Sequence, residues 1–477
     1  MRSFPYVPVE MTETRIGRRN LIKLGGLGAV ASLLGSCEKK PEIKKSDKVK
    51  GVVFMVSDGM SQGVLTMAEN FSHIVHGKGT RWWELINDPK STRGLMETSS
   101  ADSYVTDSAA ASSAWGGGMK INNNSVNVRP DGSESTPIHR HLKKLGHRTG
   151  LVTTTTITHA TPAGFAAVTK NRGDEHLIAP QYLGVVDILL GGGFKFFDAK
   201  QRVDSRDWTT PYQKSGYEVL LDRDSFLKSN SQKVLGLFNN SHLPFEVDRL
   251  NNADLKSKTP TLAEMSEFAL KRFLSGEDKF LLQIEGGKVD HACHANDVAG
   301  LLWDQLAFDE ALEKVLEMVA DRDDILVVVT SDHGNANPGL NGTGKNYTKS
   351  NEAFKSITRM TASYENILQT WGKSKTNTAE ALAALIEEKL GFKLSPEESA
   401  VLYTSVNKGE IIEWSDQLDN PNGLLGQIAG NHTGIGWTGV CHTSDPVMLS
   451  AIGPQAKRFS GIVPNQEVYK HFVELLA

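Results

Sequence analysis

The sequence predicts an α/β fold with a mainly parallel central sheet and helices on both of its faces. From residue 50 onward, short runs rich in Val, Ile, Leu and Thr recur along the chain. Several of these runs are apolar throughout, which is typical of strands covered on both faces. Stretches with helical periodicity separate them, and strands that alternate with helices favour a parallel sheet.

The individual elements follow from these patterns. We expect strands at 51–57, 148–156, 187–190, 279–284, 325–330 and 446–452. Helical periods are present at 106–115, 261–274, 297–320 and 465–476.

Residues 337–440 fit the alternation less well. Gly- and Asn-rich loops surround a helix near 376–390 and a second helix that begins at Ser395. We interpret this segment as an insertion between two parts of the sheet, which either caps a site or contacts another subunit.

The first 37 residues are expected to be a targeting segment. Arg18 and Arg19 precede an apolar stretch at 24–34, which is shorter than the ~20 residues of a membrane-spanning helix. The twin arginines favour export by the Tat route, and residues 34–37 are similar to a lipobox in which Cys37 would be acylated. A plain secretory signal peptide is the alternative.

Composition limits the partners and the redox chemistry. A formal net charge of -4 gives no reason to expect nucleic acid binding.

After the signal segment, residues 38–49 are a charged tether, and 50–477 are long enough for one large domain. Only Cys293 and Cys441 remain there, too few for a disulfide framework. A disulfide, a soft metal ligand and two inert thiols remain open, and we favour inert thiols.

Carboxylates follow three predicted strands, at the point where each strand ends. Asp58, Glu285 and Asp332 occupy these positions, each with a glycine close behind it. A single such residue usually belongs to a turn or a helix cap. However, ligands of open α/β sheets bind beyond the carboxyl ends of the strands. Three carboxylates at that edge therefore predict a metal site.

The segment IEGGKVDHACHAND adds further candidate ligands after Glu285. Asp290 and His294 are four residues apart, which places both on one face of a helix. Mixed Asp and His ligands suit zinc, and all-oxygen ligands suit magnesium. A solvated helix face is the alternative interpretation of this pair.

The stretch SYVTDSAAASSAWGGG predicts an Ala-rich helix that begins near Ser108. Thr106, Asp107 and Ser108 all suit a helix N-cap, which is the simpler explanation of these residues. The functional interpretation is a serine nucleophile at a helix terminus that holds an anion. No G-x-S-x-G motif surrounds it, and a helix terminus contributes only ~0.3–1 kcal/mol. A nucleophilic Ser108 therefore requires activation by a metal ion.

Together these motifs resemble the alkaline phosphatase family. VSDGM, YVTDSAAAS, THATPAGF, EGGKVDHACH and VVVTSDHG occur in the family's order across residues 50–477. The resemblance implies hydrolysis of small phosphomonoesters through a phosphoserine intermediate on Ser108, with two zinc ions and one magnesium ion. The implied ligands are Asp290, His294 and His442 for the first zinc, Asp58, Asp332 and His333 for the second, and Asp58, Thr161 and Glu285 for magnesium.

The resemblance also implies residues around these ions. Arg172 lies thirteen residues after His159, at the place of the family's phosphate-binding arginine, and its planar fork suits two phosphate oxygens. Asp107, His159 and His291 are expected beside the metal ligands. The two histidines match the animal-type enzymes and not the enterobacterial form, which leaves the third metal's identity open. His432 is the alternative to His442, which is preferred because PVMLSAIGP follows it.

Two other activities are alternatives. A phosphodiesterase of the same superfamily is the nearest one, although Arg172, Thr161 and Glu285 favour monoesters. A non-catalytic lipoprotein that binds metal or phosphate would not need a nucleophile at Ser108. We expect an exported protein, in the periplasm or cell envelope, anchored to membrane lipid through Cys37. A homodimer is the habit of the family.

Overall fold

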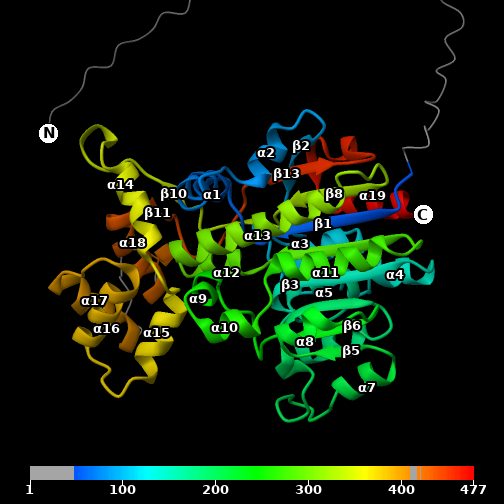
Figure 1. Ribbon diagram of the computed structural model, residues 1–477, viewed down its shortest axis with the longest axis horizontal. Coiled ribbons are helices and arrows are strands. Elements are labelled where there is room, and N and C mark those ends of the chain that lie inside the picture. The colour runs from blue at the N-terminus through cyan, green and yellow to red at the C-terminus, as the bar shows by residue number, and fades with distance from the viewer. Residues whose placement is uncertain (1–47, 409–415, 419) are drawn as a thin grey trace, which may run out of the picture. The chain divides into compact units, whose positions relative to one another are not determined.

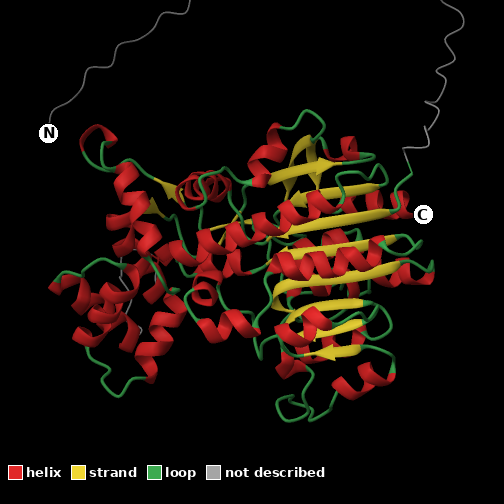
Figure 2. Ribbon diagram, in the orientation of Figure 1, coloured by secondary structure: helices red, strands yellow, loops and turns green. Residues whose placement is uncertain are grey.

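A ten-stranded sheet organises the computed structural model, which describes residues 48–408, 416–418 and 420–477 (Figures 1 and 2). Neighbouring strands are parallel except at β13, which runs antiparallel to both β8 and β2. The predicted fold class is therefore confirmed. In spatial order the strands are β14 (Gly461–Pro464), β2 (Thr92–Glu97), β13 (Val447–Ile452), β8 (Ile325–Thr330), β1 (Gly51–Ser57), β7 (Phe280–Gly286), β3 (Arg148–Thr156), β4 (Ile188–Gly192), β6 (Val234–Leu237) and β5 (Glu218–Leu220).

Helices cover both faces of the sheet, as the sequence predicts. Side chains of β1 alternate between two hydrophobic cores, with Val53 and Met55 in one and Val52 and Phe54 in the other. Because the central strands are buried on both faces, their sequences are apolar throughout. The first core draws on α1 (Gln62–Val75), α11 (Leu262–Leu274) and α13 (Val298–Met318), and the second on α3 (Ser108–Gly117), α4 (Ile138–Lys144), α5 (Ala160–Ala166) and α19 (Glu467–Leu476).

Shorter elements complete the core of the chain. They are α2 (Arg81–Asn87), α6 (Glu175–Ile178), α7 (Thr209–Lys214), α8 (Arg223–Lys228), α9 (Glu246–Leu250), α10 (Ala253–Lys258) and α12 (Lys288–His294), with the two-stranded pairs β9 (Gly334–Asn335) with β12 (His442–Thr443) and β10 (Gly339–Leu340) with β11 (Ile435–Gly436). Among the described helices, none combines the length and the apolar character needed to cross a membrane. The expected signal peptide at 1–37, its Cys37 and the tether up to residue 47 lie outside the described residues.

The segment expected to be an insertion contains α14 (Ser350–Lys355), α15 (Tyr364–Lys373), α16 (Ala379–Leu390), α17 (Pro396–Lys408) and α18 (Pro421–Thr433), and it packs on the core at the left of Figure 1. The first turn of α15 is bound to two buried aspartates of the core. Asp248 accepts a hydrogen bond from the backbone N–H of Ser363 at 2.9 Å, and Asp297 accepts one from that of Tyr364 at 2.7 Å. These bonds fix the insertion against α9 and α13.

Glycines allow α3 and α5 to pack closely. A Cβ atom at Gly164 of α5 would lie 2.6 Å from the backbone carbon of Ser112, and one at Gly116 of α3 would lie 2.7 Å from the backbone carbon of Gly164. The Ser112 hydroxyl donates a hydrogen bond to the Thr161 carbonyl across this contact, at 2.5 Å. Helices that approach so closely cannot accept even one extra methyl group without moving apart.

This packing predicts the effect of Gly164→Ala. We expect a loss of about 1–3 kcal/mol in the free energy of unfolding, because the new methyl group meets the backbone of α3. Chemical denaturation of the two proteins would measure it. Gly372→Ala is the matched control, since a Cβ atom at this helical glycine in α15 would have nothing within 4 Å. An equal effect of the two substitutions would contradict the close-packing account.

A buried histidine in α4 predicts a dependence of stability on pH. His139 packs edge-on against Phe165 with ring centres 5.5 Å apart, and burial lowers its pKa to about 3. The unfolded chain takes up a proton below about pH 6.5 and the folded chain does not, so stability falls as the pH falls through this range.

Substitution His139→Leu should remove this contribution. The difference in the free energy of unfolding between the variant and the unsubstituted protein should favour the variant by about 2 kcal/mol more at pH 5 than at pH 7.5. Urea unfolding of both proteins at the two pH values would measure this difference. A difference between the two proteins that does not change with pH would show that His139 does not titrate in this way.

Candidate active site

Three carboxylates expected at strand ends lie together at the carboxyl edge of the sheet. β1 lies between β7 and β8, and its Val56 is paired with Glu285 on one side and with Thr330 on the other. Asp58 follows β1 directly, and Asp332 lies just beyond β8. All three carboxylates are buried. Parallel pairing in this register therefore directs them into a single crevice, where ligands of such sheets bind.

A glycine brings the helix α12 beside these carboxylates. Gly59 has a φ of 69°, and a Cβ atom there would lie 2.8 Å from the Cα of Asp290. Only glycine accepts both the left-handed conformation and the close contact. On α12, Asp290 and His294 lie one turn apart, with Oδ2 and Nε2 separated by 3.3 Å. The helical spacing expected for this pair is present.

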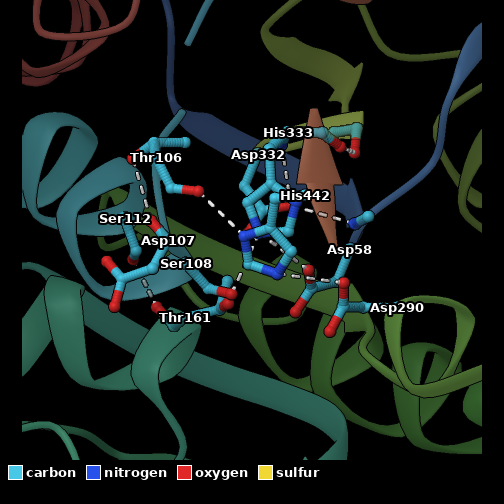
Figure 3. Close-up of polar contacts among 12 residues, drawn as sticks. Asp58, Thr106, Asp107, Ser108, Ser112, Thr161, Asp290, Asp332, His333 and His442 are labelled. Atoms are coloured by element: carbon cyan, nitrogen blue, oxygen red, sulfur yellow. Dashed lines mark hydrogen bonds and ion pairs between the residues drawn. The ribbon is translucent and has the colours of Figure 1, made fainter. Parts of the chain in front are cut away.

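The assembled side chains form three groups that could each hold a cation. Within each group, one ligand atom per residue lies within 4.8 Å of the others. The groups are Asp290, His333 and His442; Asp58, Asp332 and His333; and Asp58, His159 and Glu285. Asp58 and His333 each belong to two groups, so the three positions are contiguous. Figure 3 shows the members of the first two groups.

Buried oxygens in these groups lack hydrogen-bond partners. Among the described residues, none donates a hydrogen bond to either carboxylate oxygen of Asp58, to Oε1 of Glu285 or to Oγ1 of Thr161. Among the same residues, Oδ2 of Asp332 has only the ring of His333 as a possible donor nearby, with Nε2 at 3.1 Å. Burial, with the charges of neighbouring carboxylates, raises the pKa of Asp58 well above its usual range, and burial raises the pKa of Glu285 to about 7. Such oxygens are costly unless a cation binds them, so the donor set fits divalent metal ions.

The rings of His294 and His442 also leave a position that a cation could occupy. Nδ1 of His294 lies 2.6 Å from the Val440 carbonyl oxygen, and Nδ1 of His442 lies 2.8 Å from that of Thr106. A carbonyl oxygen only accepts, so each Nδ1 carries a proton, and each ring offers the lone pair of Nε2 once that atom is not protonated. The two Nε2 atoms are 3.0 Å apart, with oxygens of Asp290 at 3.3 and 3.6 Å. A cation among them would satisfy all these lone pairs, and the donor set fits zinc.

Ser108 is the first residue of α3, at the edge of this cluster. Asp107 is the N-cap, and its Oδ1 accepts a hydrogen bond from the backbone N–H of Ala110 at 2.8 Å. The Ser108 hydroxyl is therefore not needed as a cap, and its Oγ lies 3.1 Å from Nε2 of His333 (Figure 3). A hydroxyl placed between a helix N-terminus and a ligand cluster can approach a bound anion.

Arg172 lies beside the same helix. Its Nη1 donates to Oδ2 of Asp107 at 3.2 Å, and its Nη2 lies 3.2 Å from Nε2 of His159. The backbone N–H of Arg172 donates to the Asn124 carbonyl at 2.8 Å, which anchors the segment. The side chain remains 23% exposed, so these contacts orient the guanidinium and leave it accessible to a ligand.

One histidine near the site could not be identified from the sequence. The His242 ring is 4.6 Å from that of His291 and 5.6 Å from that of His159, measured between ring centres. His242 lies in the polar loop after β6, within NNSHLPF, where no motif distinguishes it. The sequence did not indicate Thr153 either, and its hydroxyl donates to Oε2 of Glu285 at 2.5 Å.

The remaining candidates are not members of the three ligand groups. His432 is in α18, where its ring stacks on that of Phe392 at a distance of 4.3 Å. Cys293 is buried and Cys441 is exposed, and both are free thiols.

Comparisons with known proteins agree with this geometry. The family model for alkaline phosphatase matches residues 49–477. Alkaline phosphatase 3 of Bacillus subtilis is 30% identical over 441 residues, which cover 90% of this chain and 89% of the relative. The repressible alkaline phosphatase of Saccharomyces cerevisiae is 38% identical over 319 residues, which cover 60% of this chain and 55% of the relative.

Solved structures give the same result. The alkaline phosphatase of Thermus thermophilus superposes with a TM-score of 0.85 at 30% identity, covering 93% of this chain and 96% of that one. A cold-active alkaline phosphatase from a Shewanella species superposes with a TM-score of 0.74 at 26% identity, covering 90% and 100%. The match along nearly the whole chain shows that this protein belongs to the alkaline phosphatase family of metal-dependent phosphatases.

Proposed function

We propose that this phosphatase hydrolyses phosphate monoesters through a phosphoserine intermediate on Ser108. The main support is the position of this hydroxyl, 3.1 Å from His333 Nε2 at the edge of a cluster of buried ligand atoms without partners. The nucleophile, the metal ions and the ester class are parts of the proposal, whereas the phosphatase activity follows from the family.

The proposed ions are two zinc and one magnesium. Asp58, Asp332 and His333 would hold the second zinc, and they form one of the three groups. Asp290, His294 and His442 would hold the first zinc, supported by the contacts among their ligand atoms. Asp58, Thr161 and Glu285 would hold the magnesium, supported by their unpartnered buried oxygens. Bound cations would supply positive charge that acidifies the Ser108 hydroxyl and stabilises the leaving oxygen. A ring nitrogen of His159 also lies within range of the third group, and a nitrogen ligand would favour zinc there.

The protein's own residues position the reacting atoms. Ser108 loses its proton to water, and its oxygen bonds to phosphorus while the ester oxygen leaves with the electron pair of the P–O bond and takes a proton from water. Water then attacks phosphorus, releases phosphate and restores the hydroxyl. Asp107 fixes the start of α3 and also binds Arg172, so the nucleophile and the guanidinium are held in one arrangement.

Arg172 supports the choice of monoesters. Its fork can bind two nonbridging phosphate oxygens at once. A diester has one more oxygen substituted, so the same contacts would leave less room for its second organic group. The phosphodiesterase of the same superfamily is the alternative activity that this argument disfavours.

We also propose that the protein is exported and anchored to membrane lipid. The support is the twin arginine pair, Arg18 and Arg19, and the lipobox-like sequence before Cys37, all outside the described residues. A homodimer is proposed from the family's habit.

Ester preference tests the proposed function directly. With zinc and magnesium present, kcat/KM for p-nitrophenyl phosphate should exceed that for bis-p-nitrophenyl phosphate by a large factor. Ser108→Ala should lower kcat for the monoester by about 10³-fold or more, because it removes the attacking oxygen. Ser113→Ala, farther along the same helix, is the matched control and should retain turnover.

A preference for the diester would favour the phosphodiesterase. Full activity of Ser108→Ala would exclude the phosphoserine intermediate.

A further inference from the structure

A second pocket lies at the same edge of the sheet, between the core and the insertion. Its volume is about 310 Å³, and the loop after β6, the first residue of α12 and the helix α15 contribute to its wall. The loop leaves the carboxyl end of a strand that is parallel to β4, and β4 is parallel to β3. The pocket therefore opens on the side of the sheet that carries the metal ligands.

The wall formed by the insertion is fixed. Asp248 and Asp297 bind the first turn of α15, as described above. Farther along the helix, Glu365 lies 3.4 Å from the buried ammonium group of Lys288, and Gln369 donates to Glu365 at 2.9 Å. The α15 side of the pocket is thus held in place by these bonds.

A row of half-buried imidazoles connects Arg172 with this pocket. His159 lies against Arg172, the His291 ring is 5.7 Å from that of His159, and the His242 ring is 4.6 Å from that of His291. His242 itself lines the pocket. Three imidazole rings in contact thus lie between Arg172 and this pocket.

His242 adds a hydrogen-bond donor to the pocket lining. Its Nδ1 lies 3.1 Å from the backbone nitrogen of Thr156, which can only donate. Nδ1 is therefore the acceptor, and the proton of the neutral ring is on Nε2. Asn366 and Gln369 add two more amide groups to the lining. The Asn239 amide, in contrast, is bonded within its own loop, where it accepts from the Asn240 N–H and donates to the His242 carbonyl.

We propose that this pocket binds the organic part of the substrate and that this part is a sugar or another polyol; the inference rests on the proposed function. Each hydroxyl group donates and accepts, as amide side chains do. A second phosphate group is disfavoured by the carboxylates of Asp248 and Glu365 in the lining. Stacking of a nucleobase on Phe245 is disfavoured because this ring is buried and Lys288 covers one of its faces, with Nζ 3.6 Å from the ring centre.

The test compares two monoesters with the same phosphate. We would measure kcat/KM for D-glucose 6-phosphate and for p-nitrophenyl phosphate in the metal-loaded full chain and in the double variant Asn366→Ala/Gln369→Ala. The variant should lose about tenfold or more on the sugar phosphate, since two hydrogen bonds are removed, and change less than about twofold on the aryl phosphate. Gln213→Ala, an exposed glutamine of α7, is the matched control and should change neither.

Equal losses on both substrates, or no loss on either, would overturn the proposal. Adenosine 5′-monophosphate distinguishes a sugar phosphate from a nucleotide, whose ribose also carries hydroxyl groups. A loss on this nucleotide that exceeds the loss on glucose 6-phosphate would also overturn it, in favour of a nucleoside site. Hydrolysis of p-nitrophenyl phosphate is the check on the proposed function, because its absence in the unsubstituted protein would contradict that function and not the pocket. In that case, calorimetric binding of glucose 6-phosphate to Ser108→Ala, with and without the double variant, would decide whether the pocket binds it.

Discussion

Buried ligand atoms that lack hydrogen-bond partners are the constraint on which the active site depends. Nε2 atoms of His294 and His442 lie 3.0 Å apart, and the oxygens of Asp58 have no donor among the described residues. The fold brings these atoms together from strand ends that are distant in the sequence. Without cations, the cluster would cost several kcal/mol of unsatisfied polar interactions. The stability of this region and its chemistry are therefore linked to metal binding.

Two histidine ligands connect the metal site to the segment that carries the nucleophile. His442 uses its second ring nitrogen to hold the Thr106 carbonyl, two residues before Ser108, and His294 holds the Val440 carbonyl, two residues before His442. Each ligand thus fixes the segment that carries the next functional group. On the other side, the glycine contact between α3 and α5 sets the distance between Ser108 and Thr161. Metal ligands and nucleophile are consequently positioned as one unit.

Much of the fold could be predicted from local sequence. The bounds of β1 and β8 match the expected strands because their apolar runs end at polar residues, and β3 matches because it is rich in β-branched Thr and Val. The helices α16 and α17 lie near their expected positions. The sequence does not predict β5 and β6, which have three and four residues, because runs so short carry no periodicity. It also does not predict β2, whose charged residues resemble a loop.

Local sequence likewise identifies only some residues of the active site. Residues that follow long strands or occupy motifs, such as Asp58 and Asp290, could be identified. His242, Thr153 and Ser112 could not, because they reach the site only through tertiary packing. The choice of Asp107 over Ser108 as the helix cap likewise required the backbone geometry.

Thermal unfolding before and after chelation tests the central claim most directly. Protein stripped of metal and then given zinc and magnesium should gain about 5 °C or more in Tm, because the ions bind the folded chain and not the unfolded one. The gain should be smaller in Asp58→Asn, since Asp58 belongs to two of the ligand groups. An unchanged Tm after metal removal would show that the buried ligands do not need cations, and it would contradict the account.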